Sequence, residues 1–569
     1  MDRWIGLLCG IGMLGSMPAN AGTIEAGDPP VGVMLSYTVS IADPAVPEVS
    51  IVARLTAPAG GSTAIRWSLP REFAFVRLPE PLIGVPSAAA EDGTEMTVVR
   101  LNPYEWEASA SAAREITLRY TVPLTHRELE AVRVRDAYEY PYLAADHGLL
   151  VTPTLFLYPT NVSPVEIRVD FELPQGWEVI APWPSSGTRA FKPRDLQSLT
   201  HDLIAVGHWY SQEVRLGDFQ AVIAIAPGQE ALEQGAVDPI RRVVEYELKM
   251  FEREPHGRYL FVFGRPEVNG LAGSPKTNSM TLSVEPRLAA NAAEYLGHLI
   301  AHEFFHTWTS GREIPDELRW YNEGFTDYYA YLVPARLGLA VRESFADTLG
   351  GKMAGCADNP QRGKLTLIDA GGAVFFADRD AYNLVYDGGL LLAAWLDQAI
   401  RKHDANRTLD DLMRVFNNDP RWRDDRIQPT ILDFLTRVKE FAGAPAAERF
   451  ERFIKTPYEF DSVAAFRELD VEIRYEEKPD VSLRANLDGT RLIDIDPRCA
   501  AYKIGLRADD RVLELNGREI EDASALRAAW RSPLYGRYRV RLRRGDQEIN
   551  IDQPVPIEKS FSVPSDIWR

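Results

Sequence analysis

Cysteine is scarce in this chain. Only three of its 569 residues are cysteine, and Cys9 lies in the first apolar run, so two remain beyond it, Cys356 and Cys499. Two thiols so far apart in sequence do not make a disulfide framework, which excludes the small disulfide-stabilised scaffolds. Neither thiol has a second Cys or a His at ligand spacing. We therefore expect both to be buried free cysteines.

An excess of positive charge is absent as well. The chain has 63 Lys and Arg against 82 Asp and Glu, a formal charge of −19, and no long basic run. This balance argues against a nucleic-acid partner. Hydrophobic residues make up 45% and charged residues 25%, which is typical of a folded globular protein and not of a disordered one. At roughly 100–200 residues per domain, the length predicts three or four domains.

Long hydrophobic runs are missing beyond the N-terminus, where no stretch approaches the roughly 18 apolar residues of a membrane-spanning helix. At the N-terminus, Arg3 precedes a short apolar run, Trp4–Gly15, and small residues follow at 19–21. A charged start, a short apolar segment and a small-residue site are typical of a secretory signal peptide. We predict a signal peptide over 1–21 and an exported protein, periplasmic or secreted, with no integral membrane segment after cleavage. A retained membrane anchor is the alternative.

The hydrophobic pattern changes along the chain. Up to about residue 179, apolar and polar residues alternate with period two between Pro- and Gly-containing turns. This alternation predicts an antiparallel β-sandwich over 22–205. After about residue 230 helical spacing takes over, which predicts a small sheet followed by a helical lobe over 206–458.

Within the helical lobe, the pattern predicts helices over Ala292–Trp308 and Glu323–Leu337, among others. Short strands return in the last hundred residues, with one short helix at Ser524–Trp530. The return of period two predicts a third folded unit over 459–560.

One segment of the helical lobe, residues 302–306, reads His-Glu-Phe-Phe-His. Residues four apart on a helix share a face, so His302 and His306 can bind one metal ion. Glu303 leans to the same side and can hold a water as a general base, which is the arrangement of zinc peptidases. Two histidines at a buried helix contact are the alternative for the pattern taken alone. His298 shares the face, but about 12 Å of helix axis separates it from His306, so we interpret it as packing beside the site.

A second segment, Asn322–Tyr329, completes the pattern. Catalytic zinc takes three protein ligands and leaves a position for water, and Glu323 is the natural third ligand. Asp327 lies four residues later on the same helical face, and a carboxylate commonly orients a metal-bound His through its second N–H. The two segments predict one zinc ion bound by His302, His306 and Glu323, with Asp327 behind a ligand.

These residues resemble the glycyl aminopeptidase family, exported zinc peptidases of the gluzincin group. In that family the His-Glu-x-x-His helix is followed by Glu-Gly-Phe-Thr, here Glu323–Thr326. The resemblance implies a multidomain fold with an N-terminal all-β sandwich, a thermolysin-like α+β catalytic domain with a helical lobe, and a C-terminal PDZ domain. It also implies that His302, His306 and Glu323 bind zinc and that Glu303 is the base. Relatives often have 18 residues between the second His and the ligand Glu, where this chain has 16 (307–322).

A later segment, Val385–Gly389, is similar to the Tyr-Glu-Lys-Gly-like segment that opens a helix in this group, although the Lys is absent. The resemblance implies that Tyr386 donates its hydroxyl to the developing oxyanion, a task that suits a neutral donor. A packed aromatic residue at a helix start is the alternative.

The Gly-rich segment ahead of the zinc helix is predicted to contact an extended substrate as an added strand. Its residues are Gly270, Leu271, Ala272 and Gly273. In the family, a Glu in this segment receives the substrate α-amine, but here no Glu or Asp lies between Glu267 and Glu285. A buried ammonium needs a carboxylate partner. The sequence therefore predicts either an aminopeptidase with its anchor elsewhere or an endopeptidase.

The C-terminal region resembles a bacterial PDZ domain in Asp496–Ala500, Ile504–Asp510 and Leu515–Gly517. PDZ domains bind an extended peptide end beside a strand and capture its carboxylate with backbone N–H groups. The loop expected to do so, Leu469–Val471, has Asp470 where Gly is common, and an acidic side chain repels a carboxylate. The domain is predicted either to bind peptide C-termini or to act as a packed structural module.

Our leading hypothesis is an exported zinc-dependent metallopeptidase that acts on peptide or protein substrates, with Glu303 as general base and Tyr386 as oxyanion donor. An exported peptide-binding or scaffold protein with a relict metal site is the alternative from another class. A zinc hydrolase of non-peptide amides is a third.

Overall fold

A computed structural model describes most of the chain. The described residues are 33–56, 63–70, 72–73, 76–77, 83–110, 115–124, 140–252, 257–264, 271–284, 292–309, 314–423 and 427–568. The predicted signal peptide, 1–21, and the predicted substrate-binding residue Gly270 lie outside these ranges. Within them, no helix is both long enough and apolar enough to cross a membrane. Cys356 and Cys499 are buried and unpaired with each other, as predicted.

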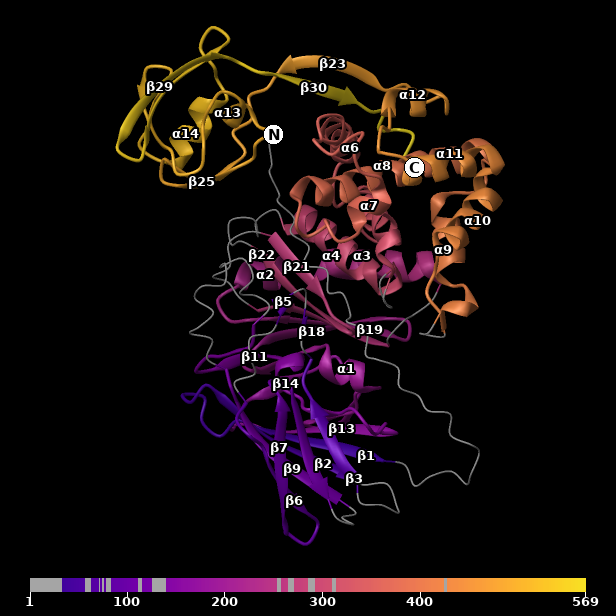
Figure 1. Cartoon of the computed structure of the whole chain (residues 1–569), viewed down its shortest axis with the longest axis vertical. Helices are drawn as coiled ribbons and strands as arrows, with labels where there is room; N and C mark the ends of the chain where they lie inside the picture. The colour runs from indigo at the N-terminus through magenta and orange to yellow at the C-terminus, as the bar shows by residue number, and fades with distance from the viewer. Residues whose placement is uncertain are drawn as a thin grey trace.

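The N-terminal part is a β-rich unit built on an eleven-stranded sheet (Figure 1). In sheet order its strands are β12 (Tyr158–Pro159), β3 (Thr63–Ser68), β8 (Glu105–Ala110), β7 (Glu95–Asn102), β6 (Ser87–Ala90), β9 (Glu115–Pro123), β2 (Glu48–Thr56), β1 (Met34–Ser40), β13 (Glu166–Glu172), β16 (Ala190–Phe191) and β15 (Ser185–Gly187). Trp67 of β3 and Tyr37 of β1 share one hydrophobic core, although their strands lie far apart in the sheet. The sheet therefore folds back over its own interior.

The alternation predicted from the sequence is present in these strands. Leu35, Tyr37 and Val39 of β1 are buried, and the residues between them are partly exposed. The strand directions differ from the antiparallel expectation at one place, because β1 pairs with β13 in parallel. Side chains alternate between the two faces in parallel and in antiparallel strands alike. The alternating pattern therefore predicts which residues are buried but not the direction of the strand.

A second, four-stranded sheet joins this unit to the next. Its order is β10 (Tyr142–Leu143), β11 (His147–Val151), β17 (Leu203–Gly207) and β14 (Glu178–Ile180), and the short helix α1 (Leu196–Thr200) precedes β17. A separate two-stranded hairpin pairs β4 (Glu72–Phe73) with β5 (Val76–Arg77).

The central sheet has five strands. In order they are β18 (Tyr210–Leu216), β19 (Phe219–Ile225), β20 (Arg258–Phe263), β22 (Ser279–Val284) and β21 (Leu271–Pro275), which is an edge strand. Side chains alternate between its faces. Ala221 and Ile223 of β19 enter the core shared with the helices, whereas Val222 and Ala224 enter a core shared with β11 and β17. Because both faces are covered, β19 and β20 read as continuous apolar runs.

Helices cover the other side of the central sheet (Figure 1). They are α2 (Glu230–Gly235), α3 (Val237–Phe251), α4 (Ala292–Thr309), α5 (Thr326–Leu337), α6 (Arg342–Ala357), α7 (Leu367–Gly371), α8 (Arg379–His403), α9 (Leu409–Asn417), α10 (Ile431–Ala442), α11 (Ala444–Lys455) and α12 (Ser462–Arg467). A 3₁₀ turn, η5 (Asp316–Leu318), and a π-helical segment, η6 (Trp320–Phe325), lead into α5. The residues of α4 from 295 to 306 are all buried, so this helix crosses the interior between sheet and lobe.

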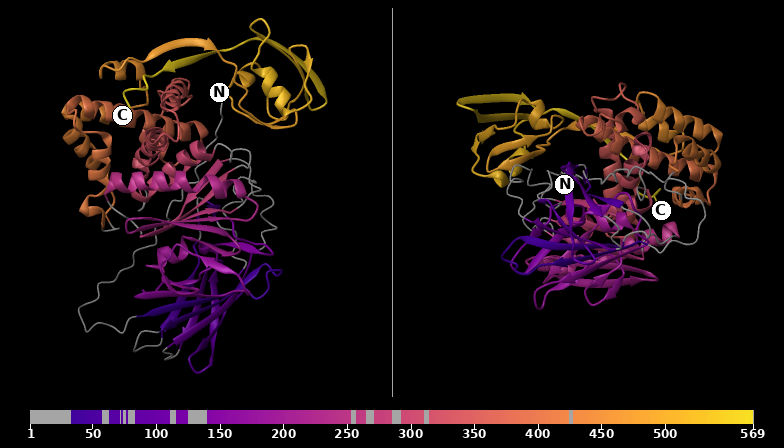
Figure 2. Two further views of the ribbon diagram at one scale, coloured as in Figure 1. Left: turned by 180° about the vertical axis from the view of Figure 1, so that it is seen from behind. Right: turned by 60° about the horizontal axis from the view of Figure 1, so that its bottom comes forward.

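The C-terminal part is a second β unit, reached over a two-stranded ribbon of β23 (Arg474–Pro479) and β30 (Ile557–Ser562) (Figures 1 and 2). It contains β24 (Ala485–Asp488), β25 (Arg491–Ile495), β26 (Arg511–Leu515), β27 (Arg518–Glu519), β28 (Arg537–Arg544) and β29 (Gln547–Pro554), with helices α13 (Ala500–Lys503) and α14 (Ala523–Trp530). These elements enclose a hydrophobic core of their own. The PDZ assignment of this unit stays a prediction.

The loop predicted to bind peptide carboxylates lies elsewhere. Val471 packs in the core of the helical part, and Asp470 accepts a hydrogen bond from Lys402, at the end of α8, at 2.9 Å. The segment therefore belongs with the helices and not with the core of the C-terminal β unit. The chain end also returns to the helices, where Trp568 packs edge-on against Tyr328 and Phe345.

Candidate metal centre

The centre begins on α4. His302 and His306 lie one turn apart on this helix, and their Nε2 atoms approach to 3.2 Å. Glu323 enters from η6 and places Oε2 3.9 Å from Nε2 of His302 and 3.8 Å from Nε2 of His306. All three side chains are buried. Among the residues that the structure describes, this is the one group of three such side chains whose ligand atoms lie within 4.8 Å of one another.

The donor set fits a zinc ion. Tetrahedral ligand atoms at zinc bond lengths lie about 3.3–3.6 Å apart, close to the three separations found here. Burial raises the pKa of Glu323 to about 7, against the opposing effects of His302 and the Tyr386 hydroxyl. Burial and the neighbouring His302 lower the pKa of His306 well below its usual value, which favours the neutral, metal-binding imidazole. A divalent cation would compensate the buried carboxylate and accept both nitrogen lone pairs.

Glu303 follows His302 on α4 and is fully buried. Strand β21 lies directly against it, because a Cβ atom at Gly273 would be 2.9 Å from Cγ of Glu303 and 3.1 Å from its Oε1. A side chain at position 273 would displace the carboxyl group. Glycine therefore allows the edge strand to run beside the predicted base.

Two neighbours hold the Glu323 carboxylate. The Asn322 side chain donates from Nδ2 to Oε1 at 2.8 Å, and the Tyr386 hydroxyl donates to Oε2 at 2.6 Å. Oε2 is the same atom that lies near both imidazoles, so the Tyr386 hydroxyl reaches the interior of the centre. Our sequence analysis missed Asn322, although its position next to the predicted ligand was a usable signal.

A close helix crossing brings Tyr386 to this place. Segment η6 and α8 touch through two glycines: a Cβ at Gly324 would lie 2.4 Å from Cα of Gly389, and a Cβ at Gly389 would lie 2.3 Å from the Trp320 carbonyl oxygen. Only residues without a side chain permit this approach. Because Tyr386 lies one turn before Gly389 on α8, the crossing places its ring beside Glu323.

Asp327 lies behind His302, as predicted. Its Oδ1 is 3.6 Å from Nδ1 of His302 and 3.8 Å from Nε2 of His298. Burial alone would lower the pKa of His302, but Asp327 and the neighbouring glutamates raise it above its usual value. Burial lowers the pKa of His298 to about 3, and its ring packs 4.1 Å from that of Tyr331, outside the ligand cluster.

A lysine that the sequence analysis missed completes this layer. Lys352 of α6 lies 3.1 Å from Oδ2 of Asp327 and 2.8 Å from Oδ1 of Asp387, the residue after Tyr386. Burial opposes the charge, but the two carboxylates raise the pKa of Lys352 well above its usual value. The ammonium group thus joins the His302 side of the centre to the Tyr386 side. No local motif signals a contact between residues so far apart in sequence.

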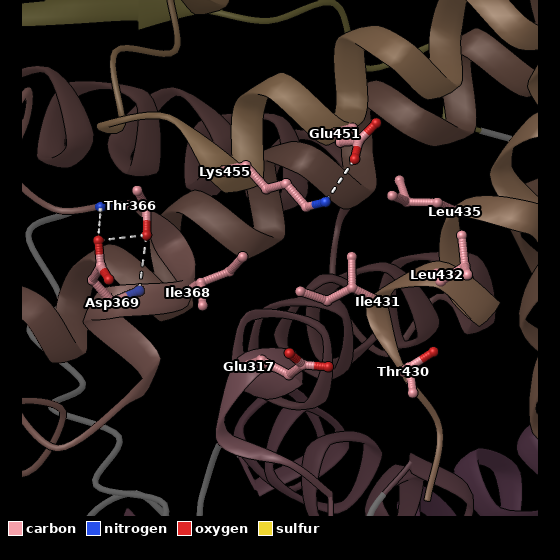
Figure 3. A pocket seen from close by; sticks show the side chains of 10 residues that line it. All are labelled: Glu317, Thr366, Ile368, Asp369, Thr430, Ile431, Leu432, Leu435, Glu451 and Lys455. Atoms are coloured by element: carbon pink, nitrogen blue, oxygen red, sulfur yellow. Dashed lines mark hydrogen bonds and ion pairs between the residues drawn. The ribbon is translucent and has the colours of Figure 1, made fainter.

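The structure describes the predicted substrate-binding residues except Gly270. Leu271 and Ala272 belong to β21, together with Gly273, whose contact with Glu303 is given above. A separate groove of about 700 Å³ lies between α7, α10 and α11 (Figure 3) and shares no residue with the metal centre. Its lining residues are Glu317, Thr366, Ile368, Asp369, Thr430, Ile431, Leu432, Leu435, Glu451 and Lys455.

The sequence matches two models of one peptidase family. Residues 36–202 match the peptidase M61 N-terminal domain, and residues 296–392 match the M61 glycyl aminopeptidase. In these two segments the chain is similar to the M61 peptidase family. The match to a glycyl aminopeptidase model supports a zinc metallopeptidase, and the matched segment runs from α4 into α8, so that it includes every ligand candidate, Glu303 and Tyr386.

Solved structures are similar to this chain at low sequence identity. An aminopeptidase N family protein from Idiomarina loihiensis is similar with a TM-score of 0.72 and 15% identity, over 94% of this chain and 99% of that chain. An M1 zinc metallopeptidase from Deinococcus radiodurans has a TM-score of 0.46 and 14% identity, over 74% of this chain and 94% of its own. A search of curated proteins gave no match. The first similarity confirms the multidomain fold with an N-terminal β-rich unit and a helical part.

Proposed function

We propose that this protein hydrolyses peptide bonds with one zinc ion held by His302, His306 and Glu323, with Glu303 as general base and Tyr386 as oxyanion donor. The observation that carries the proposal is the convergence of two imidazoles and a carboxylate within 4.8 Å of one another. The Tyr386 hydroxyl reaches the same point from a third element.

Each side chain has a definite task in this proposal. Zinc, when bound, polarises the scissile carbonyl and lowers the pKa of a water. Glu303 takes the proton of the attacking water and passes it to the leaving amine. Tyr386 turns its hydroxyl from Glu323 to the developing oxyanion, as a neutral donor in a site that excludes water. Asp327 has Oδ1 3.6 Å from Nδ1 of His302, where its charge favours a proton on Nδ1 and leaves Nε2 to face the metal.

The substrate backbone is proposed to bind beside β21. Among the strands that the structure describes, β21 pairs on one side only, with β22, and an added peptide strand can bond to its other side. Gly273 brings this edge against Glu303. The family match favours aminopeptidase activity, whereas the lack of an acidic residue between Glu267 and Glu285 favours endopeptidase activity.

One experiment tests the proposal and separates the two activities. Two peptides of equal sequence, Gly-Ala-Phe-Ala with a free and with an acetylated amine, are incubated with purified protein, with and without a chelator. We expect zinc in the native protein and cleavage that the chelator abolishes. Cleavage of both peptides identifies an endopeptidase, and cleavage of the free one alone identifies an aminopeptidase. Peptide binding without chelator-sensitive cleavage would instead identify a binding protein with a relict site.

Export is part of the proposal on the strength of the N-terminal sequence alone. Cleavage after Ala21 gives a defined mature N-terminus. Intact-mass measurement on protein recovered from a secreting host checks this point, and retention of residues 1–21 contradicts it.

Replacing Lys352 with Met is expected to raise the zinc dissociation constant by about 10- to 100-fold, the usual effect of removing an outer partner of a metal site. The change leaves the carboxylates of Asp327 and Asp387 without their common cation, so Asp327 no longer holds His302 in place. Competition against a chromogenic chelator measures the constant. Lys402→Met is the matched control, because Lys402 also binds an aspartate but at the far end of α8. Equal zinc affinities in the two variants would contradict the role of Lys352.

A further inference from the structure

A buried carboxylate, Asp202, lies at the junction between the N-terminal β-rich unit and the metallopeptidase part. This residue follows α1, directly before β17, and its side chain has no exposed surface. Oδ1 accepts hydrogen bonds from the backbone N–H of Asn278 at 2.7 Å and from Oγ of Ser279 at 2.8 Å. Oδ2 accepts from Nδ2 of Asn278 at 2.8 Å and from Nε1 of Trp183 at 3.1 Å. Three of the four donors therefore belong to the β21–β22 hairpin.

Backbone groups beside Asp202 reinforce the same junction. The N–H of Thr277, in the hairpin turn, donates to the His201 carbonyl at 3.0 Å. The N–H of Leu203 donates to Oγ of Ser279 at 3.1 Å. The turn between β21 and β22 is thus bonded on both sides of residue 202. Its position is set by the N-terminal unit and not only by the sheet to which the hairpin belongs.

Burying a carboxylate at this junction costs more free energy than packing apolar side chains there would. Burial raises the pKa of Asp202 to about 7, against four hydrogen bonds that favour the ionised form. A buried carboxylate is expensive unless every lone pair is satisfied. In this junction the carboxylate fixes the position and the orientation of the turn, because its two oxygens accept four hydrogen bonds.

The β21–β22 hairpin that Asp202 binds extends to Glu303, the proposed base. From the turn, β21 runs back along β22 with Pro275 opposite Met280 and Gly273 opposite Leu282. Gly273 lies about 10 Å from residue 276 at 3.3 Å per residue, and it touches the carboxyl arm of Glu303. A shift of the turn therefore moves the free edge of β21 relative to Glu303.

We propose that Asp202 is a positioning residue for substrate binding: from the N-terminal unit it fixes the edge strand along which the peptide backbone binds beside Glu303. The inference rests on the proposed function, because it takes β21 as the substrate-binding edge. Asp202 touches neither substrate nor metal ligands. Its loss should therefore weaken substrate binding and spare both the metal and the chemical step.

The test is Asp202→Asn in the full-length protein. Asn keeps the volume but presents an amide NH₂ to donors that need an acceptor. We expect KM for Gly-Ala-Phe-Ala to rise about tenfold. A loss of affinity of this size corresponds to roughly one well-formed hydrogen bond between the peptide and the strand. The turnover number should stay within about threefold and the zinc affinity within about twofold. Asn278→Ala, which removes one donor from the other side, should raise KM in the same direction, and the double variant should show less than the product of the two effects.

A matched control is Asp480→Asn. Asp480 is also a buried aspartate, 1% exposed, but it lies in the C-terminal β unit, where it binds Lys503 at 3.0 Å. Its replacement should leave KM unchanged, whatever it does to thermal stability.

A second readout needs no turnover. Calorimetry compares the affinity of the same peptide for Glu303→Gln with its affinity for Glu303→Gln combined with Asp202→Asn. The combined variant should show the same tenfold loss of affinity.

The outcomes separate this inference from the proposed function. A zinc-free or inactive wild-type protein contradicts the proposed function. An active wild type with folded Asp202→Asn and Asn278→Ala variants that keep KM and peptide affinity overturns the role of Asp202 alone. Parallel losses of zinc, turnover and KM in these variants also overturn it, because they indicate a general structural role.

Discussion

Replacing Glu303 with Gln is expected to leave zinc bound and to lower kcat for peptide hydrolysis by about 10²–10⁴-fold. The amide keeps the size of the side chain and its contact with Gly273, so the fold and the ligand set should be unchanged. What it removes is the carboxylate that we propose takes the proton of the attacking water. Metal analysis and steady-state kinetics on the same preparation measure both quantities.

Tyr386→Phe provides a comparison at the other side of the centre. Removal of one oxyanion donor typically costs about 10²–10³ in kcat, so this variant should retain zinc and lose activity as well. A Glu303→Gln protein with wild-type turnover would falsify the assignment of the base. A Tyr386→Phe protein with wild-type turnover would restrict Tyr386 to holding Glu323.

Replacing Gly389 with Ala is expected to lower the free energy of unfolding by at least about 3 kcal/mol, because overpacking that backbone groups cannot relieve is more costly than an ordinary core substitution. The added Cβ would lie 2.3 Å from the Trp320 carbonyl oxygen. No side-chain rotation removes that clash, so α8 must withdraw from η6. Tyr386 and Glu323 would then separate, and zinc affinity should fall as well.

The control for this prediction is Gly351→Ala. Gly351 is also a helical glycine, but a Cβ there meets nothing within 4 Å, so helix propensity should stabilise the variant by up to about 1 kcal/mol. Urea unfolding followed by circular dichroism compares the two proteins, and chelator competition gives their zinc affinities. Wild-type stability of Gly389→Ala would show that the close crossing of α8 and η6 is wrong.

The local sequence was sufficient to predict the part of the site whose residues lie one helical turn apart. The hydrophobic pattern predicted the helix over Ala292–Trp308, on which His302 and His306 share a face, and the structure has α4 at Ala292–Thr309. It was insufficient at Glu323: the predicted helix over Glu323–Leu337 is α-helical only from Thr326, and its first three residues belong to the π-helical segment Trp320–Phe325. Gly324 of this π turn packs closely against α8, and the spacing of hydrophobic residues along the sequence does not report such packing.

Tertiary contacts that join distant segments left little trace in the sequence. Helix α6 carries Lys352, which binds Asp327 25 residues earlier and Asp387 35 residues later. Asp202 meets Asn278 across 76 residues. Charged and polar residues of these kinds occur throughout an acidic chain, so neither pair is distinguishable before the fold brings its members together.

The amino-acid sequence by itself determined the resemblance to a peptidase family, the order of β-rich and helical parts, and the residue types that can bind a metal, because these depend on short-range spacing and on side-chain chemistry. Only the tertiary structure decided that Tyr386 reaches Glu323, that Lys352 joins two aspartates behind the centre, and that the N-terminal unit holds the β21–β22 turn through Asp202. The physical reason is that each of these contacts depends on how closely two backbones approach, and that distance is set by the packing of whole elements.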